Sequence, residues 1–279
     1  MFDVAAFCRS ERAKGEEEKY PADPEHNRAD DCDDDDRVLE IGLQCGETVP
    51  MTHPAPQAAI FDFDETIIDL EKQHAAASSA LCRAMGNRYE DLSDSYRSMS
   101  GRRVIDEIRD MRGYFGWKRS VEDLLAERQR YFDHEIASSA DLKLMTGAEA
   151  FIRDLHARNM RLAIATSAVR KSIETILRRF DLLQLFEVIV DGSEVERGKP
   201  DPQVFLITAQ RLRADPAACI VFEDSEVGVR AAKAAGMVCV AVRNPNAQTK
   251  QNLDPADLIV NSFGEIDVER LVTSLPSSR

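Results

Sequence analysis

The chain has 279 residues, 43% hydrophobic and 31% charged, a composition typical of a globular enzyme built as one large domain or as a domain with an insertion. Its net charge of -14 is uneven: residues 1–50 hold 15 acidic against 6 basic residues, and the other 229 hold 35 against 30. This mildly acidic main part argues against nucleic-acid binding through a basic face. Without a long apolar run or a signal peptide, we expect a cytoplasmic protein with no membrane partner.

The six cysteines, at positions 8, 32, 45, 82, 219 and 239, match no zinc-site spacing. Cys219 and Cys239 lie in apolar runs that are typical of core strands. We therefore interpret the cysteines as reduced thiols of a cytosolic protein.

Residues 1–57 contain the acidic runs Glu16–Glu18 and Asp33–Asp36, prolines and little periodic hydrophobicity. Such a segment cannot bury enough apolar surface to offset the entropy of ordering, so we predict that it is mostly disordered. Two alternatives stay open: an acidic interaction tail, or a natural start at Met51. N-terminal sequencing of the native protein tests the second, because a terminus before residue 40 would contradict it.

A short apolar strand, Ala59–Phe61, comes first and is followed by a stretch with helical periodicity. We predict helices over 69–85, ended by Gly86, over 101–111 and over 121–136, with a loop carrying aromatic anchors over 113–117. Because no convincing strand falls between about 69 and 141, this block is predicted to be an all-helical unit.

Strands and helices then alternate. The predicted strands are 161–166, 187–190, 219–222, 238–242 and 258–260; the predicted helices are 147–158, 169–180, 202–213, 226–235 and about 266–271. Short, continuously apolar strands are expected when helices cover both faces of a parallel sheet. The pattern predicts a doubly wound, Rossmann-like α/β core (58–68 and 142–279) interrupted by a helical insertion (69–141).

Ligands of such sheets bind beyond the carboxyl ends of the strands, and polar residues fall at these ends. Asp62 and Asp64 follow the first strand and, with a period of two, emerge on the same side. The other strand ends supply Thr166, Ser167, Lys199, Glu223 and Asp224. Singly, these residues could be helix caps or solvated loop charges. Together they predict a site for a divalent cation and a phosphoryl group.

Four ordered stretches carry a resemblance to a known family: Phe61–Thr66, Ile164–Ser167, Arg197–Pro202 and Phe222–Ser225, the last with Gly228 and Ala231–Ala232. Over about residues 58–245 the chain resembles the haloacid dehalogenase superfamily. The similarity is to its β-phosphoglucomutase-like and phosphoglycolate-phosphatase-like branch with a helical cap.

The resemblance implies that Asp62 attacks phosphorus to form an aspartyl-phosphate, and that Asp64 is general acid and then base. It implies that the cofactor is Mg²⁺, held by Asp62, Asp64 and Asp224 with Glu223 close by. Phosphoryl oxygens would be bound by the residues that follow the second and third strands, which are Thr166, Ser167 and Lys199.

The resemblance makes the helical insertion a cap that closes over the site and selects the leaving group. His74 and Arg102 are its candidate substrate contacts, although a solvated helix face explains most such residues. Glu65 departs from this branch, which usually has glycine there, a residue that permits tight backbone geometry beside the metal. We treat Glu65 as a question about substrate.

The implied function is a Mg²⁺-dependent phosphatase acting on a small phosphorylated metabolite such as a sugar phosphate or phosphoglycolate, as a monomer or weak dimer. The alternative enzyme is a sugar phosphomutase, which fits His74 but lacks a clear cap lysine at the expected place. A non-enzymatic scaffold using the acidic tail is a third reading, against which the complete residue set argues.

Overall fold

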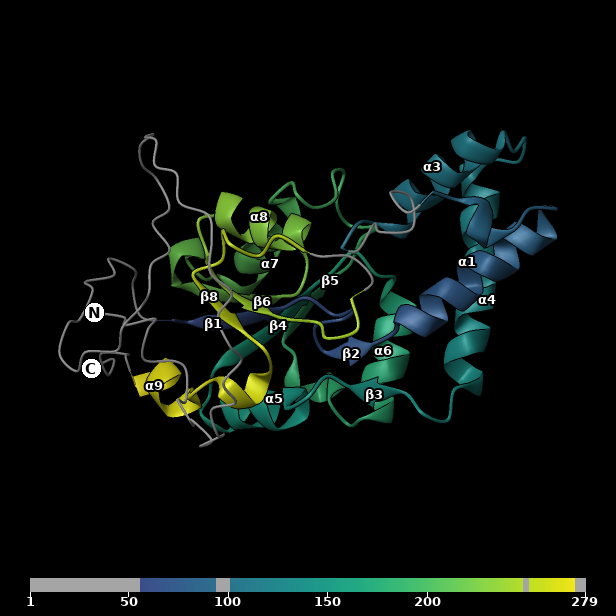
Figure 1. Cartoon of the computed structure of the whole chain (residues 1–279). Coiled ribbons are helices and arrows are strands. Elements are labelled where there is room, and N and C mark those ends of the chain that lie inside the picture. Colours follow the sequence, from purple (N-terminus) through teal and green to yellow (C-terminus); the bar gives the residue numbers. More distant parts are fainter. Residues whose placement is uncertain (1–55, 94–100, 248–250, 274–279) are drawn as a thin grey trace, which may run out of the picture. The chain divides into compact units, whose positions relative to one another are not determined.

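The structure is a computed structural model, which describes residues 56–93, 101–247 and 251–273 (Figure 1). The acidic segment up to residue 55 lies outside these ranges, and with it lie the predictions of disorder, of an interaction tail and of a start at Met51. Within the three ranges, no helix is long and apolar enough to cross a membrane.

Six parallel strands form the central sheet, in the order β5-β4-β1-β6-β7-β8. Their bounds are β1 Ala58–Phe61, β4 Arg161–Ala165, β5 Val188–Val190, β6 Cys219–Glu223, β7 Val238–Val242 and β8 Leu258–Val260. The central strands are apolar and almost wholly buried, as expected for strands covered on both faces. The predicted doubly wound α/β sheet is therefore confirmed.

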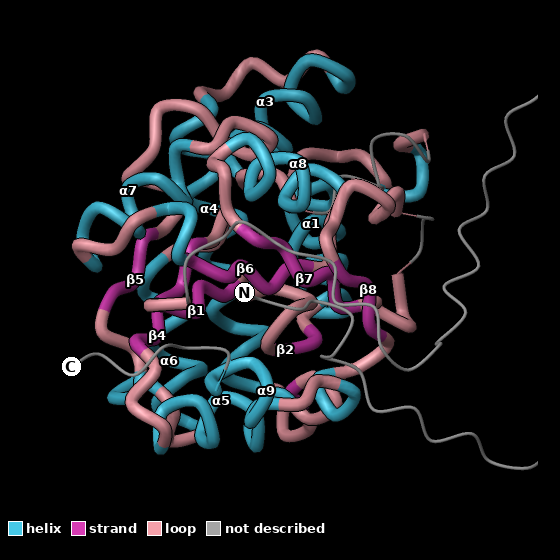
Figure 2. Tube along the Cα trace, turned by 90° about the vertical axis from the view of Figure 1, so that its left-hand side faces the viewer, coloured by secondary structure: helices cyan, strands magenta, loops and turns pink. Residues whose placement is uncertain are grey.

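Helices cover both faces of the sheet (Figure 2). One face packs against α5 (Ala148–Ala157), α6 (Arg170–Arg179) and α9 (Val268–Thr273), and the other against α7 (Gln203–Leu212) and α8 (Glu226–Ala234). The side chains of β1 alternate between these layers, with Phe61 in the cluster that includes α5 and Ile60 in the cluster that includes α7. This alternation explains why β1 is apolar throughout.

The register of the sheet brings three strand ends to one level. Phe61 of β1 pairs with Ile164 of β4 on one side and with Phe222 of β6 on the other. The Phe61 and Phe222 rings stack with centroids 4.7 Å apart, and both side chains are fully buried. Because the strands end together above this packed layer, the polar residues that follow them meet at one rim.

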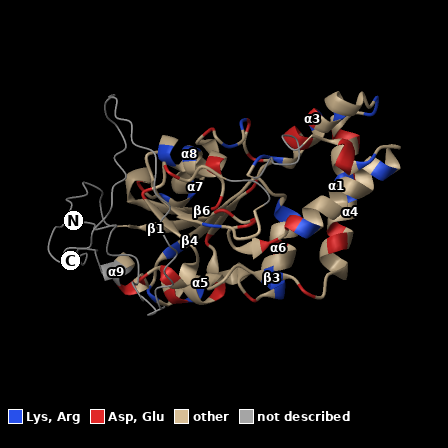
Figure 3. Ribbon diagram, in the orientation of Figure 1, with Lys and Arg blue, Asp and Glu red and all other residues tan. Residues whose placement is uncertain are grey.

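The helical insertion consists of α1 (Glu71–Ala84), the short turn η2 (Tyr89–Asp91), α3 (Val104–Phe115) and α4 (Val121–Ser138). It lies in the chain between β2 (Ile68–Asp69) and β3 (Lys143–Leu144), two short strands that pair antiparallel. Its helices pack around a separate apolar cluster that includes Leu81, Ile108 and Leu124. Charged residues of both signs are interspersed along its helices (Figure 3).

The predicted loop over 113–117 is wrong in its first part, because α3 continues to Phe115. Gly116 ends the helix in the left-handed conformation, at φ 67°. Phe115 stacks on Trp117, whose Nε1 donates to Asn87 Oδ1 at 2.7 Å. These aromatic contacts offset the low helix propensity of Gly113. The C-terminal helix is also shifted by about two residues from its predicted position.

Candidate active site

Lys199 lies between two buried carboxylates beyond the ends of β1 and β6. Its Nζ donates to Asp62 Oδ1 at 2.6 Å and to Glu223 Oε1, and its side chain is only 1% exposed. Burial raises the pKa of Asp62 to about 7, and the charge of Lys199 opposes that rise. Burial alone would lower the pKa of Lys199, but the two carboxylates raise it. The lysine is therefore held as a fixed cation beside Asp62.

Asp224 completes a buried acidic cluster with Asp62 and Glu223. Ligand oxygens of the three carboxylates lie within 4.8 Å of one another. Burial and the charges of Glu223 and Asp62 raise the pKa of Asp224 well above its usual range, although Thr66 Oγ1 donates to its Oδ1 at 2.9 Å. When all three carboxyl groups are ionised, they and the lysine carry a net charge of -2, so a divalent cation with oxygen ligands fits this donor set.

Glu223 differs from its neighbours because its carboxylate is already satisfied by protein donors. Its Oε2 accepts hydrogen bonds from Asp224 N, Ser225 N and Ser225 Oγ at 2.8–2.9 Å, while Oε1 faces Lys199. Its side chain occupies the space that a Cβ on Gly228 would fill. The structure thus gives Glu223 a clear part in orienting Lys199 and the start of α8, whether or not it also binds a metal.

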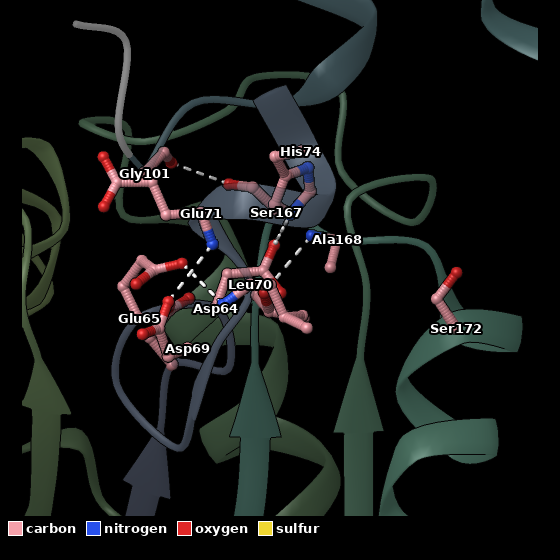
Figure 4. A network of polar contacts seen from close by, with 12 residues as sticks. Asp64, Glu65, Asp69, Leu70, Glu71, His74, Gly101, Ser167, Ala168 and Ser172 are labelled. Atoms are coloured by element: carbon pink, nitrogen blue, oxygen red, sulfur yellow. Dashed lines mark hydrogen bonds and ion pairs between the residues drawn. The ribbon is translucent and has the colours of Figure 1, made fainter. Parts of the chain in front are cut away.

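Asp64 contacts the helical insertion through His74 of α1 (Figure 4). Arg128 Nη2 lies 2.8 Å from His74 Nδ1, and because a guanidinium can only donate, Nδ1 must be the acceptor. The proton of a neutral imidazole is then on Nε2, which donates to Asp64 Oδ2 at 3.1 Å. The other oxygen, Asp64 Oδ1, is buried and has no partner among the described residues.

Sequence reasoning did not identify Arg128, which is the largest fully buried side chain of the described chain. Its Nε donates to Ser78 Oγ, and its guanidinium lies 5.4 Å from the centroid of Phe132, the ring on which His74 stacks. The one available signal was an arginine on the apolar face of α4, four residues before Phe132. That spacing gives no indication of its partner on another helix.

Thr166 and Ser167 follow β4 but have different surroundings. Thr166 is buried at the end of β4, where its Oγ1 accepts from Ala168 N at 3.2 Å and no hydrogen bond given by its own hydroxyl proton is seen among the described residues. Ser167 Oγ instead donates to the carbonyl of Gly101 at 2.8 Å (Figure 4). Of the three residues predicted to bind phosphate, Ser167 therefore has its only side-chain proton engaged in a contact with the insertion.

Arg102 does not join the carboxylate cluster in the structure. Its Nη2 pairs with Asp110 Oδ2 of α3 at 3.0 Å. Its neighbour Arg103 pairs with Asp106 and donates through Nη1 to the carbonyls of Val195 and Glu196 at 2.9 and 3.1 Å. Arg103 thus links the insertion to the loop that carries Lys199, a contact that the sequence did not indicate.

Residues 59–242 match the protein family described as "Haloacid dehalogenase-like hydrolase". This chain belongs to that family. A validoxylamine A 7'-phosphate phosphatase from Streptomyces hygroscopicus subsp. limoneus is 32% identical over 213 residues, which are 75% of this chain and 95% of that protein. A phosphorylated carbohydrates phosphatase from Thermotoga maritima is 34% identical over 188 residues, which are 65% of this chain and 82% of that protein. The chain is accordingly a phosphatase of the hydrolase class.

A solved β-phosphoglucomutase from Clostridium difficile has the same fold, with a TM-score of 0.67 and 23% identity over 78% of this chain and 98% of that chain. The resemblance to the haloacid dehalogenase superfamily stated from the four motifs is confirmed. The names of these two phosphatases specify their substrates, which are validoxylamine A 7'-phosphate for the first and phosphorylated carbohydrates for the second.

Glu65 stands where the resemblance leads us to expect glycine, and the structure shows how its side chain is accommodated. Its φ is 62°, in the left-handed region that glycine adopts most easily. Its carboxylate is largely buried and accepts hydrogen bonds from Leu70 N and Asn244 Nδ2. Burial raises its pKa to about 8, and the Leu70 N–H opposes the rise. The unusual side chain is therefore built into the turn after β1.

Proposed function

We propose that the protein is a Mg²⁺-dependent phosphatase that hydrolyses a small phosphorylated sugar or sugar-like compound through an aspartyl-phosphate on Asp62. The observation that carries the proposal is the buried cluster of Asp62, Glu223 and Asp224 around Lys199, which has an excess of negative charge and has Asp64 two residues after Asp62. Membership of the haloacid dehalogenase-like hydrolase family supports it.

In the proposed reaction, an Asp62 carboxylate oxygen attacks phosphorus while the bond to the leaving oxygen breaks. Asp64 gives its proton to that oxygen and then accepts a proton from the water that cleaves the aspartyl-phosphate. The Nε2–H of His74 holds Asp64 Oδ2 in place for both transfers. Lys199 and the free hydroxyl proton of Thr166 bind phosphoryl oxygens, where fixed positive charge stabilises the transition state.

Mg²⁺ would be held by carboxylate oxygens of Asp62 and Asp224 and by Asp64, and it would supply the positive charge that lets an anionic phosphate approach an anionic nucleophile. Thr66 orients Asp224 for that role by donating to its Oδ1. Glu223 keeps Lys199 directed at the same place. Below these charged residues, Phe61 and Phe222 stack in the buried apolar layer of the sheet, which supports the strand ends that carry the charges.

The charges of the described residues favour a sugar phosphate over a substrate with a second anionic group. Three basic side chains of the insertion and of α6 are paired with carboxylates, as Arg102–Asp110, Arg103–Asp106 and Lys171–Asp133, and Arg128 is buried against His74. A neutral, hydroxyl-rich leaving group needs no such cation, whereas the carboxylate of phosphoglycolate does.

The test is a phosphate-release screen over sugar phosphates, phosphoglycolate and nucleotides, with Mg²⁺ and with EDTA. We expect release from sugar phosphates, its loss in EDTA and its loss in Asp62→Asn. Full activity of Asp62→Asn would contradict the nucleophile assignment. Conversion of a hexose 1-phosphate to its 6-phosphate without free phosphate would instead establish the mutase alternative, which His74 also suits.

A further inference from the structure

Glu65 has a left-handed backbone conformation, which glutamate residues rarely adopt. A φ of 62° is uncommon for residues other than glycine, asparagine and aspartate. Its N–H donates to the carbonyl of Ile68 at 2.8 Å, which closes the turn that follows Asp64. Since glycine would adopt this conformation at lower cost, the side chain must contribute something that glycine cannot.

The carboxylate of Glu65 joins three segments of the chain. Its Oε1 accepts from Leu70 N at 2.9 Å, at the residue that precedes α1 (Figure 4). Its Oε2 accepts from Asn244 Nδ2 at 3.0 Å, in the loop after β7. The turn after β1, the start of α1 and the β7 loop are therefore held by one side chain that is 9% exposed.

A second carboxylate–amide pair, Asp69 with Asn246, joins the same two segments as the pair of Glu65 with Asn244. Asn246 Nδ2 donates to Asp69 Oδ2 at 3.0 Å, and Asn246 N donates to Asn244 Oδ1 at 2.8 Å. The β7 loop is fixed in turn to β8, because Arg243 N donates to the carbonyl of Val260 at 2.8 Å. The oxygen of the Asn244 amide is thus already used, which leaves only its Nδ2 to face Glu65.

Two residues of the proposed reaction depend on this arrangement. Asp64 directly precedes Glu65, and His74 N donates to the carbonyl of Leu70 at 2.9 Å. The Glu65 carboxylate therefore fixes the chain on both sides of the 3.1 Å contact between Asp64 and His74. A shift of either end would misplace the proton donor relative to the leaving oxygen, and such errors are costly to catalysis.

We propose that Glu65, held by Asn244, is a positioning residue that keeps Asp64 and His74 in register, an inference that rests on the proposed phosphatase function. Where a glycine would leave the turn flexible, the Glu65 side chain joins the turn to Leu70 and to Asn244. The role concerns the chemical step and not substrate binding, because neither Glu65 nor Asn244 belongs to the residues assigned to the phosphoryl group.

The first test removes the carboxylate or its partner in the full-length protein. In Glu65→Gly the backbone conformation remains easy to adopt, so the melting temperature should change little. We expect kcat to fall about tenfold, equivalent to about 1.4 kcal/mol, with KM within about twofold, and the same for Asn244→Ala. Asn261→Ala, which breaks an exposed amide–carboxylate pair with Glu265, is the matched control and should be neutral.

The second test exchanges the donor and the acceptor. Glu65→Gln places its amide N–H₂ against Asn244 Nδ2, so two donors face each other and kcat should fall. In the double variant Glu65→Gln/Asn244→Asp, the new carboxylate accepts from the glutamine and still accepts from Asn246 N. Recovery of most of the lost kcat is expected. Failure to recover, or single variants with kcat within twofold of the wild type, would overturn the proposal.

Hydrogen exchange separates this inference from the proposed function, because it needs no substrate. The amides of Leu70 and His74 should exchange faster in Asn244→Ala than in the wild type and in Asn261→Ala. If the wild type releases phosphate from no compound, the proposed function fails, and the exchange rates still decide the contact. Unchanged exchange at both amides refutes the positioning role even in an active enzyme.

Discussion

Replacing Arg128 by methionine is the sharpest test of how the helical insertion acts on the chemistry. The two side chains are similar in length, but methionine cannot donate a hydrogen bond to His74 Nδ1. His74 could then carry its proton on either nitrogen. In the form protonated on Nδ1, its Nε2 lone pair would face the Asp64 carboxylate, and the contact that holds Asp64 would be lost.

The size of the effect follows from the bond that is removed. A hydrogen bond from a charged donor contributes about 1.5–3 kcal/mol, and this bond is 2.8 Å long with an arginine that is 1% exposed. If the loss is felt fully in the transition state, kcat falls by about 10- to 150-fold. Stability should change little, because the printed partners of Arg128 are neutral groups of His74 and Ser78, so that methionine leaves no buried carboxylate without its cation, and because Arg128 Nη1 is itself buried without a partner among the described residues.

The assay compares two leaving groups. An alkoxide from a sugar phosphate needs a proton from Asp64, whereas p-nitrophenolate leaves without one. In single-turnover measurements of leaving-group release, which precede the transfer of a proton from water to Asp64, Arg128→Met should therefore slow release of the sugar strongly and release of p-nitrophenolate by less than about threefold. Arg130→Met, which alters an exposed arginine of the same helix, is the control. Equal losses on both substrates would refute the argument that Arg128 acts through His74 on the general acid.

Three further predictions concern stability and reactivity. Lys199→Met leaves two buried carboxylates without their cation and should lower the free energy of unfolding by about 3–5 kcal/mol in urea denaturation without metal, with part of the loss recovered in Mg²⁺. Gly228→Ala should displace Glu223 and reduce both the melting temperature and kcat, whereas Gly113→Ala, where a Cβ meets nothing within 4 Å, should be neutral. Burial raises the pKa of Cys82 to about 12 and that of Cys219 to about 11, and Cys239 is also buried. A variant with serine at positions 8, 32 and 45 should therefore react with a thiol reagent only after unfolding; rapid reaction of the folded variant would contradict the burial of these thiols.

The sheet could be predicted from the sequence because its strands carry a local signal. Each is a continuous apolar run between helices, and the polar residue that ends it is directly next in the chain. The parallel arrangement then places Asp62, Thr166 and Glu223 at one rim without further information. What failed locally was the end of α3, where contacts of Phe115 with Trp117 outweigh the presence of Gly113.

Contacts between distant segments could not be predicted in this way. Arg128 and His74 are 54 positions apart, and Glu65 and Asn244 are 179 apart, so no periodic pattern relates them. An arginine on the apolar face of α4 was a visible anomaly, but its meaning required the packing of α4 on α1. For the same reason, the sequence did not indicate that Ser167, which the resemblance implies is a phosphate ligand, donates to the carbonyl of Gly101, 66 positions away.

These contacts divide the proposed machinery by where each group is anchored. Asp62 and Lys199 are held by buried ion pairs within the core, at the ends of the strands, and Arg103 of the insertion contacts only the backbone of the loop that carries Lys199. Asp64 is held from two sides: by the core, through Glu65 and Asn244, and by the insertion, through His74 and Arg128. Movement of the insertion away from the core would break the His74 contact but leave the nucleophile in place. The two proton transfers proposed for Asp64, and not the attack of Asp62 on phosphorus, are therefore the steps that depend on the position of the insertion.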